Sequence, residues 1–230
     1  MLKIQFAPMP LIACQKLDWL RLLKVFELSD EPDLMFRWEY PMTKFQPGGG
    51  INSDCLDVSK VRVNEVFSEV YGYSTEAKEG WAIEKSNLTN GLKDVRLVNL
   101  DKQEKKKDYF YQKRFKGELE TRLIIMNYHP VIRLDKIKSV SDDDIPGKVT
   151  GYKLIPVEVD NKIDAFCNKL KLDYGELDIL EGVIIDVNPT PGDAAWVRMP
   201  LMQASEYLWE YIKRFKENYE TTGLSGSFRG

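Results

Sequence analysis

Residues on which many catalytic and structural sites depend are scarce in this chain of 230 residues. It contains one histidine, His129, and three cysteines, Cys14, Cys55 and Cys167. A single histidine excludes any chemistry that needs two imidazoles. Three cysteines at these spacings form neither a zinc motif nor a disulfide framework. Unpaired thiols are typical of a reducing compartment, so we expect a cytoplasmic protein.

The chain also lacks the sequence features of nucleic-acid-binding and membrane-spanning proteins. Its net charge is −3, from 33 basic and 36 acidic residues, so there is no basic surplus to neutralise a phosphate backbone. The run 101–108 mixes both signs and is typical of a solvated turn. No apolar run approaches the ~18–20 residues that cross a bilayer, and residues 1–14 do not have the pattern of a signal peptide. We therefore expect neither a nucleic-acid partner nor a membrane partner.

The clearest pattern that is present lies between Lys171 and Trp196. Five apolar residues stand at odd positions: Leu177, Ile179, Val183, Ile185 and Val187. Four polar residues stand at even positions: Glu176, Asp178, Asp186 and Asn188. Because successive side chains of a strand point to opposite faces, this alternation predicts two strands, each with an apolar and a polar face. Glu181 and Gly182 predict the turn, and we expect a three-residue loop with Gly182 in the left-handed conformation.

An odd-numbered loop pairs even positions with even positions, so it places Asp178, Asp186 and Asn188 on one shared face. Two carboxylates and a carboxamide on a rigid sheet form an all-oxygen site suited to Mg²⁺ that carries phosphates. The other interpretation is that these are ordinary solvent-facing positions of an amphipathic hairpin. Clustered carboxylates repel one another when no cation is present. Under the first interpretation, Asp186→Asn should therefore leave the metal-free fold intact or slightly more stable.

The residues after the hairpin make this pattern more specific. Asn188 is followed by Pro189-Thr190-Pro191-Gly192. The segment LDYGELDIL…VIIDVNPTPG resembles the ATP-grasp superfamily, whose last core strands end in a metal-binding D…(D/E)-x-N pattern and a Pro/Gly corner. The resemblance covers residues 58–216. It implies an α+β fold in which two lobes with antiparallel sheets clamp ATP, and it implies Mg²⁺ as a second cofactor.

We expect three lobes and a tail. The triple glycine Gly48–Gly50 marks a boundary after a small N-terminal lobe, predicted over residues 1–57; these glycines could instead cradle a phosphate. By the resemblance, residues 58–115 form a nucleotide lid. Residues 116–220 then form a large lobe with the metal site and a C-terminal helix. Residues 221–230 are predicted to be disordered.

Capping residues and periodicity predict the elements that carry the other candidate residues. Ser59 and Asp160 are predicted N-caps of two helices with apolar residues at i, i+3, i+4 and i+7, and Gly72 ends the first. Strands are predicted over 81–85, 95–100, 109–115, 119–128 and 131–137, with a turn at 127–130.

The resemblance assigns five residues to nucleotide binding. Lys60, in a first helical turn, is a candidate phosphate contact; by itself it is simply an exposed lysine. Lys85 ends a strand and Ser86 begins a loop of small residues, which is how the family holds a triphosphate; the alternative is a plain hairpin. Backbone groups from Gln112 to Phe115 would read the adenine edge.

Arg122 is the candidate catalytic residue, because it resembles an arginine that relatives keep in an E-x-R strand. It could equally pair with Glu120 close by. One position departs from the family. Many relatives have an arginine two residues before the first metal carboxylate, where it steadies an acyl phosphate, and here that position is Glu176.

Most of the family activates a carboxylate as an acyl phosphate, from which an amine or thiol displaces phosphate. The resemblance therefore implies an ATP- and Mg²⁺-dependent ligase that joins a small-molecule or peptide carboxylate to an amine. Two alternatives stay open: a phosphotransferase acting on a hydroxyl or sugar, and a nucleotide-binding scaffold without catalysis. The sequence identifies neither the substrates nor the oligomeric state, and a homodimer is one option.

Overall fold

The structure is a computed structural model of the chain. It describes residues 2–7, 26–29, 31, 34–37, 52, 54–88, 95–115, 117, 119–138, 149–158 and 160–189. The triple glycine, the predicted C-terminal helix and the predicted tail lie outside these residues. Within them, no helix has both the length and the apolar character that crossing a bilayer requires.

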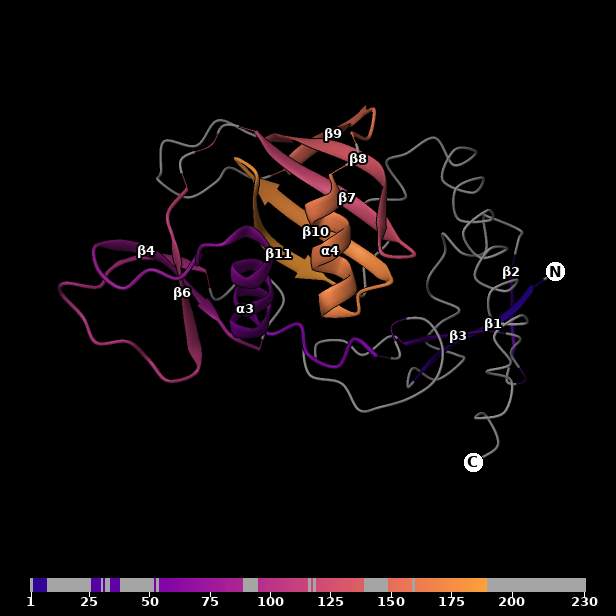
Figure 1. The fold of residues 1–230 in the computed structure, drawn as a ribbon, viewed down its shortest axis with the longest axis horizontal. Coiled ribbons are helices and arrows are strands. Elements are labelled where there is room, and N and C mark those ends of the chain that lie inside the picture. Colours follow the sequence, from indigo (N-terminus) through magenta and orange to yellow (C-terminus); the bar gives the residue numbers. More distant parts are fainter. Residues whose placement is uncertain are drawn as a thin grey trace.

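The described residues form three β-sheets (Figure 1). The first is parallel, in the order β2-β1-β3, from β1 (Leu2–Ala7), β2 (Phe26–Leu28) and β3 (Leu34–Arg37). The second, called the lid sheet, is antiparallel in the order β5-β4-β6, from β4 (Trp81–Ser86), β5 (Arg96–Asn99) and β6 (Tyr109–Lys113). The large sheet is antiparallel in the order β11-β10-β7-β8-β9, from β7 (Glu120–Met126), β8 (His129–Lys138), β9 (Val149–Ile155), β10 (Tyr174–Leu180) and β11 (Val183–Asn188).

The predicted α+β fold with two antiparallel sheets is confirmed. Each of the three sheets falls within one of the ranges 1–57, 58–115 and 116–220, whose boundaries themselves stay predictions.

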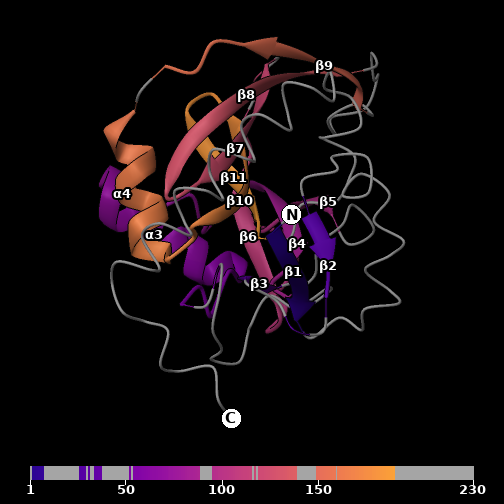
Figure 2. The same cartoon turned by 90° about the vertical axis from the view of Figure 1, so that its right-hand side faces the viewer.

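Two helices, α3 (Lys60–Tyr71) and α4 (Asn161–Leu170), lie side by side along one face of the large sheet (Figure 2). Their predicted N-caps are confirmed, because the Ser59 and Asp160 side chains accept hydrogen bonds from the first turn of each helix. Gly72 ends α3 at a φ of +83°, where a side chain would be strained.

The core of this part of the molecule lies between the two helices and the large sheet. Its buried side chains include Val63, Val66 and Phe67 of α3, Ile163, Phe166, Cys167 and Leu170 of α4, and Leu123, Ile125, Leu177, Ile184 and Val187 of the sheet. By packing, α3 therefore shares the core of the large sheet, although it directly precedes the lid sheet in the chain.

The hairpin loop between β10 and β11 is shorter than predicted. It has two residues, Glu181 and Gly182, with φ of +51° and +76°, and Leu180 pairs with Val183 across it. The three-residue loop is therefore wrong, whereas the left-handed conformation of Gly182 is confirmed. Two consecutive residues with positive φ match the right-handed twist of the flanking strands, which favours a two-residue turn.

A β-bulge then restores the predicted pairing. Ile179 pairs with Ile184 and Asp178 pairs with Asp186, so Ile185 is the extra residue on β11. The bulge reverses the parity of the first residues of β11. Ile184 rather than Ile185 therefore lies opposite Ile179 on the core face, and it is 1% exposed.

The turn from α4 into β10 holds a buried carboxyl group, that of Asp173. Its Oδ1 accepts a hydrogen bond from the backbone N–H of Asn52 at 2.7 Å. Burial raises the pKa of Asp173 from 3.8 to about 7, although backbone hydrogen bonds oppose the shift. The folded protein thus holds a proton here that the unfolded chain releases near pH 4.

We predict that Asp173→Asn reduces the pH dependence of folding stability. Because the folded pKa is raised, the stabilising contribution of this group is full below about pH 4 and is lost as the pH rises through about 7. At about 1.4 kcal/mol per pKa unit, the loss amounts to a few kcal/mol. Asparagine keeps the oxygen acceptor but does not ionise. Urea unfolding at several pH values measures the free energy of unfolding of both proteins. We expect the stability of the variant to rise relative to that of the wild type as the pH increases. A difference in stability that does not change with pH would contradict the raised pKa of Asp173.

Candidate functional site

The face of the large sheet opposite the helices carries a cluster of charged side chains, called here the polar face. Cross-strand pairing places Asp186, Asp178 and Arg122 in one row across β11, β10 and β7. The predicted placement of Asp178 and Asp186 on one shared face is thereby confirmed, and the two residues pair directly. The charged residues of the polar face are Glu120, Arg122, Lys136, Lys138, Glu176, Asp178 and Asp186.

Asp178 is bound by two cations. Arg122 grips it with two hydrogen bonds, Nε to Oδ1 at 2.8 Å and Nη2 to Oδ2 at 3.1 Å. Lys136 Nζ lies 2.7 Å from Oδ2. Burial alone would raise the pKa of Asp178, but the hydrogen bonds from Arg122 and the charge of Lys136 hold it below its usual range.

Glu120 and Arg122, which the sequence could have paired, have different partners. Glu120 forms ion pairs with Lys136 and Lys138 from the neighbouring strand β8. Arg122 forms ion pairs with Asp178 and Glu176 from β10. Lys136 therefore bridges Glu120 and Asp178, and the charges of three strands form one connected network.

Glu176, which replaces the arginine of many relatives, is buried with 2% of its surface exposed. Its Oε2 lies 3.0 Å from Arg122 Nη1, and its side chain is hydrogen bonded to Asn188. Its Oε1 is buried and has no hydrogen-bond partner among the described residues. Burial raises the pKa of Glu176 to about 7, and the nearby charge of Arg122 limits the rise. Although position 176 is not an arginine, the guanidinium of Arg122, on the neighbouring strand β7, lies beside it.

Lys60 and Lys85 approach the same hairpin from outside the large sheet. Lys60, 6% exposed, forms an ion pair with Asp186. Lys85 Nζ donates a hydrogen bond to the carbonyl oxygen of Ile185 at 2.9 Å. Burial lowers the pKa of Lys85 to about 8; the carboxylate of Asp186 opposes this shift and the charge of Lys60 adds to it. The exposed lysine that the sequence alone suggested at position 60 is not what the structure shows.

The start of α3 and the end of β4 are joined, and this brings the two lysines together. Asn87, just after β4, accepts a hydrogen bond from the Lys60 N–H through its backbone carbonyl (3.3 Å). Its side-chain Oδ1 accepts another from the Val61 N–H at 3.0 Å. Because Asn87 occupies these two N–H groups, the cationic group that α3 offers to the site is the side chain of Lys60.

A small pocket lies where α3, the lid sheet and β11 meet. Its described lining residues are Lys60, Val63, Asn64, Thr75, Lys85, Phe110, Gln112, Ile184 and Ile185. The structure therefore brings the predicted nucleotide residues Lys60, Lys85 and Gln112 together. Ser86, paired with Tyr109, and Phe115, packed against the core of the large sheet, are not among the residues that line it.

The predicted metal ligands supply oxygen atoms, which are hard donors of the type that Mg²⁺ prefers. Asp178 and Asp186 are directly paired, and Asn188 with its neighbour Glu176 adds further oxygens beside them. The unpartnered Oε1 of Glu176 is a buried acceptor that a cation could satisfy. In the described part of the chain, no three acidic, histidine or cysteine side chains gather as a metal cluster. Asp178, Asp186 and Asn188 therefore stay a prediction as the metal ligands.

The expectation that Asp178 and Asp186 repel each other is wrong, because both carboxylates have cationic partners. Arg122 and Lys136 neutralise Asp178, and Lys60 neutralises Asp186. Lys136 and Lys138 belong to this site but were not predicted from the sequence. The available signal was two lysines at i and i+2 in a strand that also carries buried apolar residues. Such a pattern requires carboxylates on the same face.

Comparisons with known proteins identify similar folds among solved structures only. A scan against protein-family models and a search of the curated proteins find no match. Among solved structures, D-alanine–D-alanine ligase from Bacillus anthracis matches with a TM-score of 0.55 at 13% identity, over 94% of this chain and 98% of that chain. The same ligase complexed with ATP matches with a TM-score of 0.57 at 12% identity, over 95% of this chain and 99% of that chain.

The ATP-grasp ligase PsnB complexed with a minimal precursor matches with a TM-score of 0.46 at 11% identity, over 67% of this chain. The chain spans 61% of the length of that ligase. At these identities the likeness defines the fold. The protein has the ATP-grasp fold, as the sequence resemblance implied.

We predict that Asp186→Asn destabilises the metal-free protein, contrary to the expectation from the sequence. The substitution leaves the buried ammonium of Lys60 without its anion, which costs about 1–3 kcal/mol because Asp186 itself is 37% exposed. In a double-mutant cycle, Lys60→Met combined with Asp186→Asn should recover most of this loss. Urea denaturation of the four proteins measures the coupling. Additive losses would show that the ion pair does not stabilise the fold.

Proposed function

We propose that this protein is an ATP- and Mg²⁺-dependent ligase that joins the carboxylate of a small molecule or peptide to an amine. The observation that carries the proposal is the convergence of Lys60 and Lys85 on the hairpin that pairs Asp178 with Asp186. Two cations and two carboxylates at one place are what binding of a metal-bound triphosphate requires. The ATP-bound B. anthracis ligase of the same fold supports this assignment.

Binding requires an exchange of partners on the hairpin. Lys60 neutralises Asp186 in the structure, and Lys85 is held by the Ile185 carbonyl. When phosphate oxygens arrive, both ammonium groups can turn to them, and the carboxylates then become available as ligands. Asp178, Asp186 and Asn188 would hold Mg²⁺, which supplies charge neutralisation at the phosphates when bound.

The chemistry proceeds in two displacements. An oxygen of the substrate carboxylate attacks the γ-phosphorus, and the bond to the β-phosphate oxygen breaks with its electron pair leaving on ADP. The amine then attacks the carbonyl carbon of the acyl phosphate, loses a proton, and the carbon–oxygen bond breaks to release phosphate. Neither step needs a side-chain nucleophile from this chain, in keeping with a single histidine.

Arg122 would steady negative charge on the acyl phosphate. Burial opposes the charged form, but the hydrogen bonds that Arg122 donates to Asp178 and the charges of Asp178 and Glu176 raise its pKa, so it stays a cation throughout. Its guanidinium is held from β10 by Asp178 and Glu176, and the ring of Tyr152 lies 5.8 Å away. We infer that Arg122 takes the role of the arginine that many relatives carry at the position of Glu176.

We predict that Lys85→Met weakens Mg-ATP binding by roughly tenfold or more, about 1.4 kcal/mol. The substitution removes the ammonium group that is proposed to contact phosphate. Because this group is desolvated in the free protein, its loss should change the melting temperature of the free protein little. Lys102→Met, at an exposed position of the 101–108 turn, is the matched control and should bind normally. Isothermal titration with and without Mg²⁺ makes the measurement. Equal affinities of both variants would remove Lys85 from the nucleotide site.

A second prediction concerns turnover. ADP should form only when a carboxylate and an amine are supplied together, and a screen of paired substrates by coupled ADP detection tests this. A phosphorylated hydroxyl product would instead identify a phosphotransferase. In either case, Mg-ADP at a hundredfold excess over its Kd should stabilise the fold by about 2.7 kcal/mol. Stabilisation without turnover on any substrate pair would identify a binding scaffold and contradict the ligase.

A further inference from the structure

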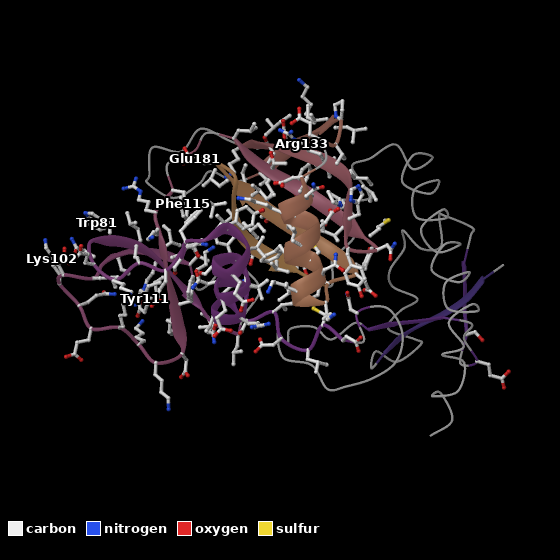
Figure 3. The ribbon with its side chains drawn as sticks, viewed as in Figure 1. Trp81, Lys102, Tyr111, Phe115, Arg133 and Glu181 are labelled. Carbon is white, nitrogen blue, oxygen red and sulfur yellow. The ribbon has the colours of Figure 1, made fainter. Side chains whose placement is uncertain are left out.

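A second and larger groove lies on the helix-covered side of the large sheet, away from the polar face. Its volume is about 610 Å³, within the range of roughly 300–1,000 Å³ typical of ligand sites. Its described lining residues are Tyr71, Gly117, Leu119, Thr121, Leu123, Pro130, Arg133, Glu158, Asp160, Ile163, Ile179, Glu181 and Gly182. Figure 3 shows two of them, Glu181 at the tip of the β10–β11 hairpin and Arg133 on the large sheet. None of them belongs to the candidate nucleotide site.

The floor of this groove is apolar. Leu123 and Ile163 are buried, and Ile179 packs against the same core. Leu119 stands at the edge with 50% of its surface exposed. Exposing such a side chain beside a concave apolar surface costs free energy that an apolar ligand would recover. Tyr71 also lines the groove, and its hydroxyl is buried and has no hydrogen-bond partner among the described residues.

The rim of the groove is acidic. Glu158, Asp160 and Glu181 are exposed carboxylates. The cation among the lining residues, Arg133, is already paired, with its Nε 3.3 Å from Asp135 Oδ1. The rim therefore presents an unbalanced negative charge around an apolar floor. The complementary ligand combines apolar side chains with at least one cationic side chain.

We propose that this groove binds a peptide segment of a partner polypeptide that combines aliphatic or aromatic residues with lysine or arginine. Five of the lining residues belong to three adjacent strands: Pro130 and Arg133 of β8, Thr121 and Leu123 of β7, and Ile179 of β10. With about 4.8 Å between neighbouring strands, the floor is about 10 Å wide, the length of three extended residues. The proposal is independent of the nucleotide site, because the groove and the nucleotide pocket share no lining residue.

The test uses fluorescein-labelled hexapeptides in which leucine alternates with lysine, and matched peptides with glutamate in place of lysine. Fluorescence polarisation with the full chain should show saturable binding of the lysine peptides, on the order of 100 μM or tighter. Binding of the glutamate peptides should be at least tenfold weaker. Saturating Mg-ADP should not displace the lysine peptides, so the outcome is separate from that of the proposed function.

Paired variants locate the binding surface. Leu119→Asp changes the edge of the groove and Glu181→Lys changes its rim. Each substitution should weaken binding of the lysine peptides at least fivefold. Leu154→Asp, which is 45% exposed on β9 outside the groove, and Glu79→Lys, an exposed glutamate before the lid sheet, are the matched controls. The proposal is overturned if no lysine peptide binds up to about 1 mM, if glutamate peptides bind equally, or if control and groove variants behave alike.

Discussion

The cost of removing charge from water governs the polar face of the large sheet. Glu176, Glu120 and Lys136 each have less than a tenth of their surface exposed, and an unpaired ion at such depth costs several kcal/mol. The structure meets this constraint with a chain of ion pairs from Lys138 through Glu120, Lys136 and Asp178 to Arg122 and Glu176. Removing Arg122 would leave Glu176 without its partner in this chain of ion pairs, and removing Glu120 would leave Lys138 without one.

This constraint bears on the proposed function. Asp178 and Asp186 are already neutralised by lysine and arginine side chains, so under the proposal metal and nucleotide bind by exchanging partners. The β-bulge is central to the exchange. It leaves Ile185 outside the regular pairing of β11, and its carbonyl oxygen accepts the hydrogen bond from Lys85. One irregular residue thus connects the lid sheet to the β10–β11 hairpin.

Local patterns in the sequence predicted the elements well. Caps such as Ser59 and Asp160 depend on a few neighbouring residues, and strand alternation depends on burial of a single face, so both can be found without tertiary information. The apolar face of α4, including Cys167, was predicted for the same reason. The shared face of Asp178 and Asp186 was also predicted correctly, but it arises from a two-residue loop and a bulge, two features whose effects on parity cancel.

Long-range charge pairing could not be predicted in this way. Arg122 and Asp178 are 56 residues apart in sequence, and Lys60 and Asp186 are 126 apart. Which cation neutralises which carboxylate depends on strand order, which no local pattern contains. Glu120 was considered as the partner of Arg122 because the two residues are close together in the sequence. The same limit explains why the carboxylates were expected to repel each other.

The most direct test of the account is the position of the metal. Mn²⁺ can replace Mg²⁺ at oxygen sites and scatters X-rays anomalously, so a crystal of the protein with ADP and Mn²⁺ shows where the ion lies. We predict an anomalous peak within about 2.0–2.4 Å of side-chain oxygens of Asp178, Asp186 and Asn188, with Lys60 moved from Asp186 to the phosphates. A peak bound to ADP with no oxygen from this hairpin, while Lys60 still pairs with Asp186, would contradict the account.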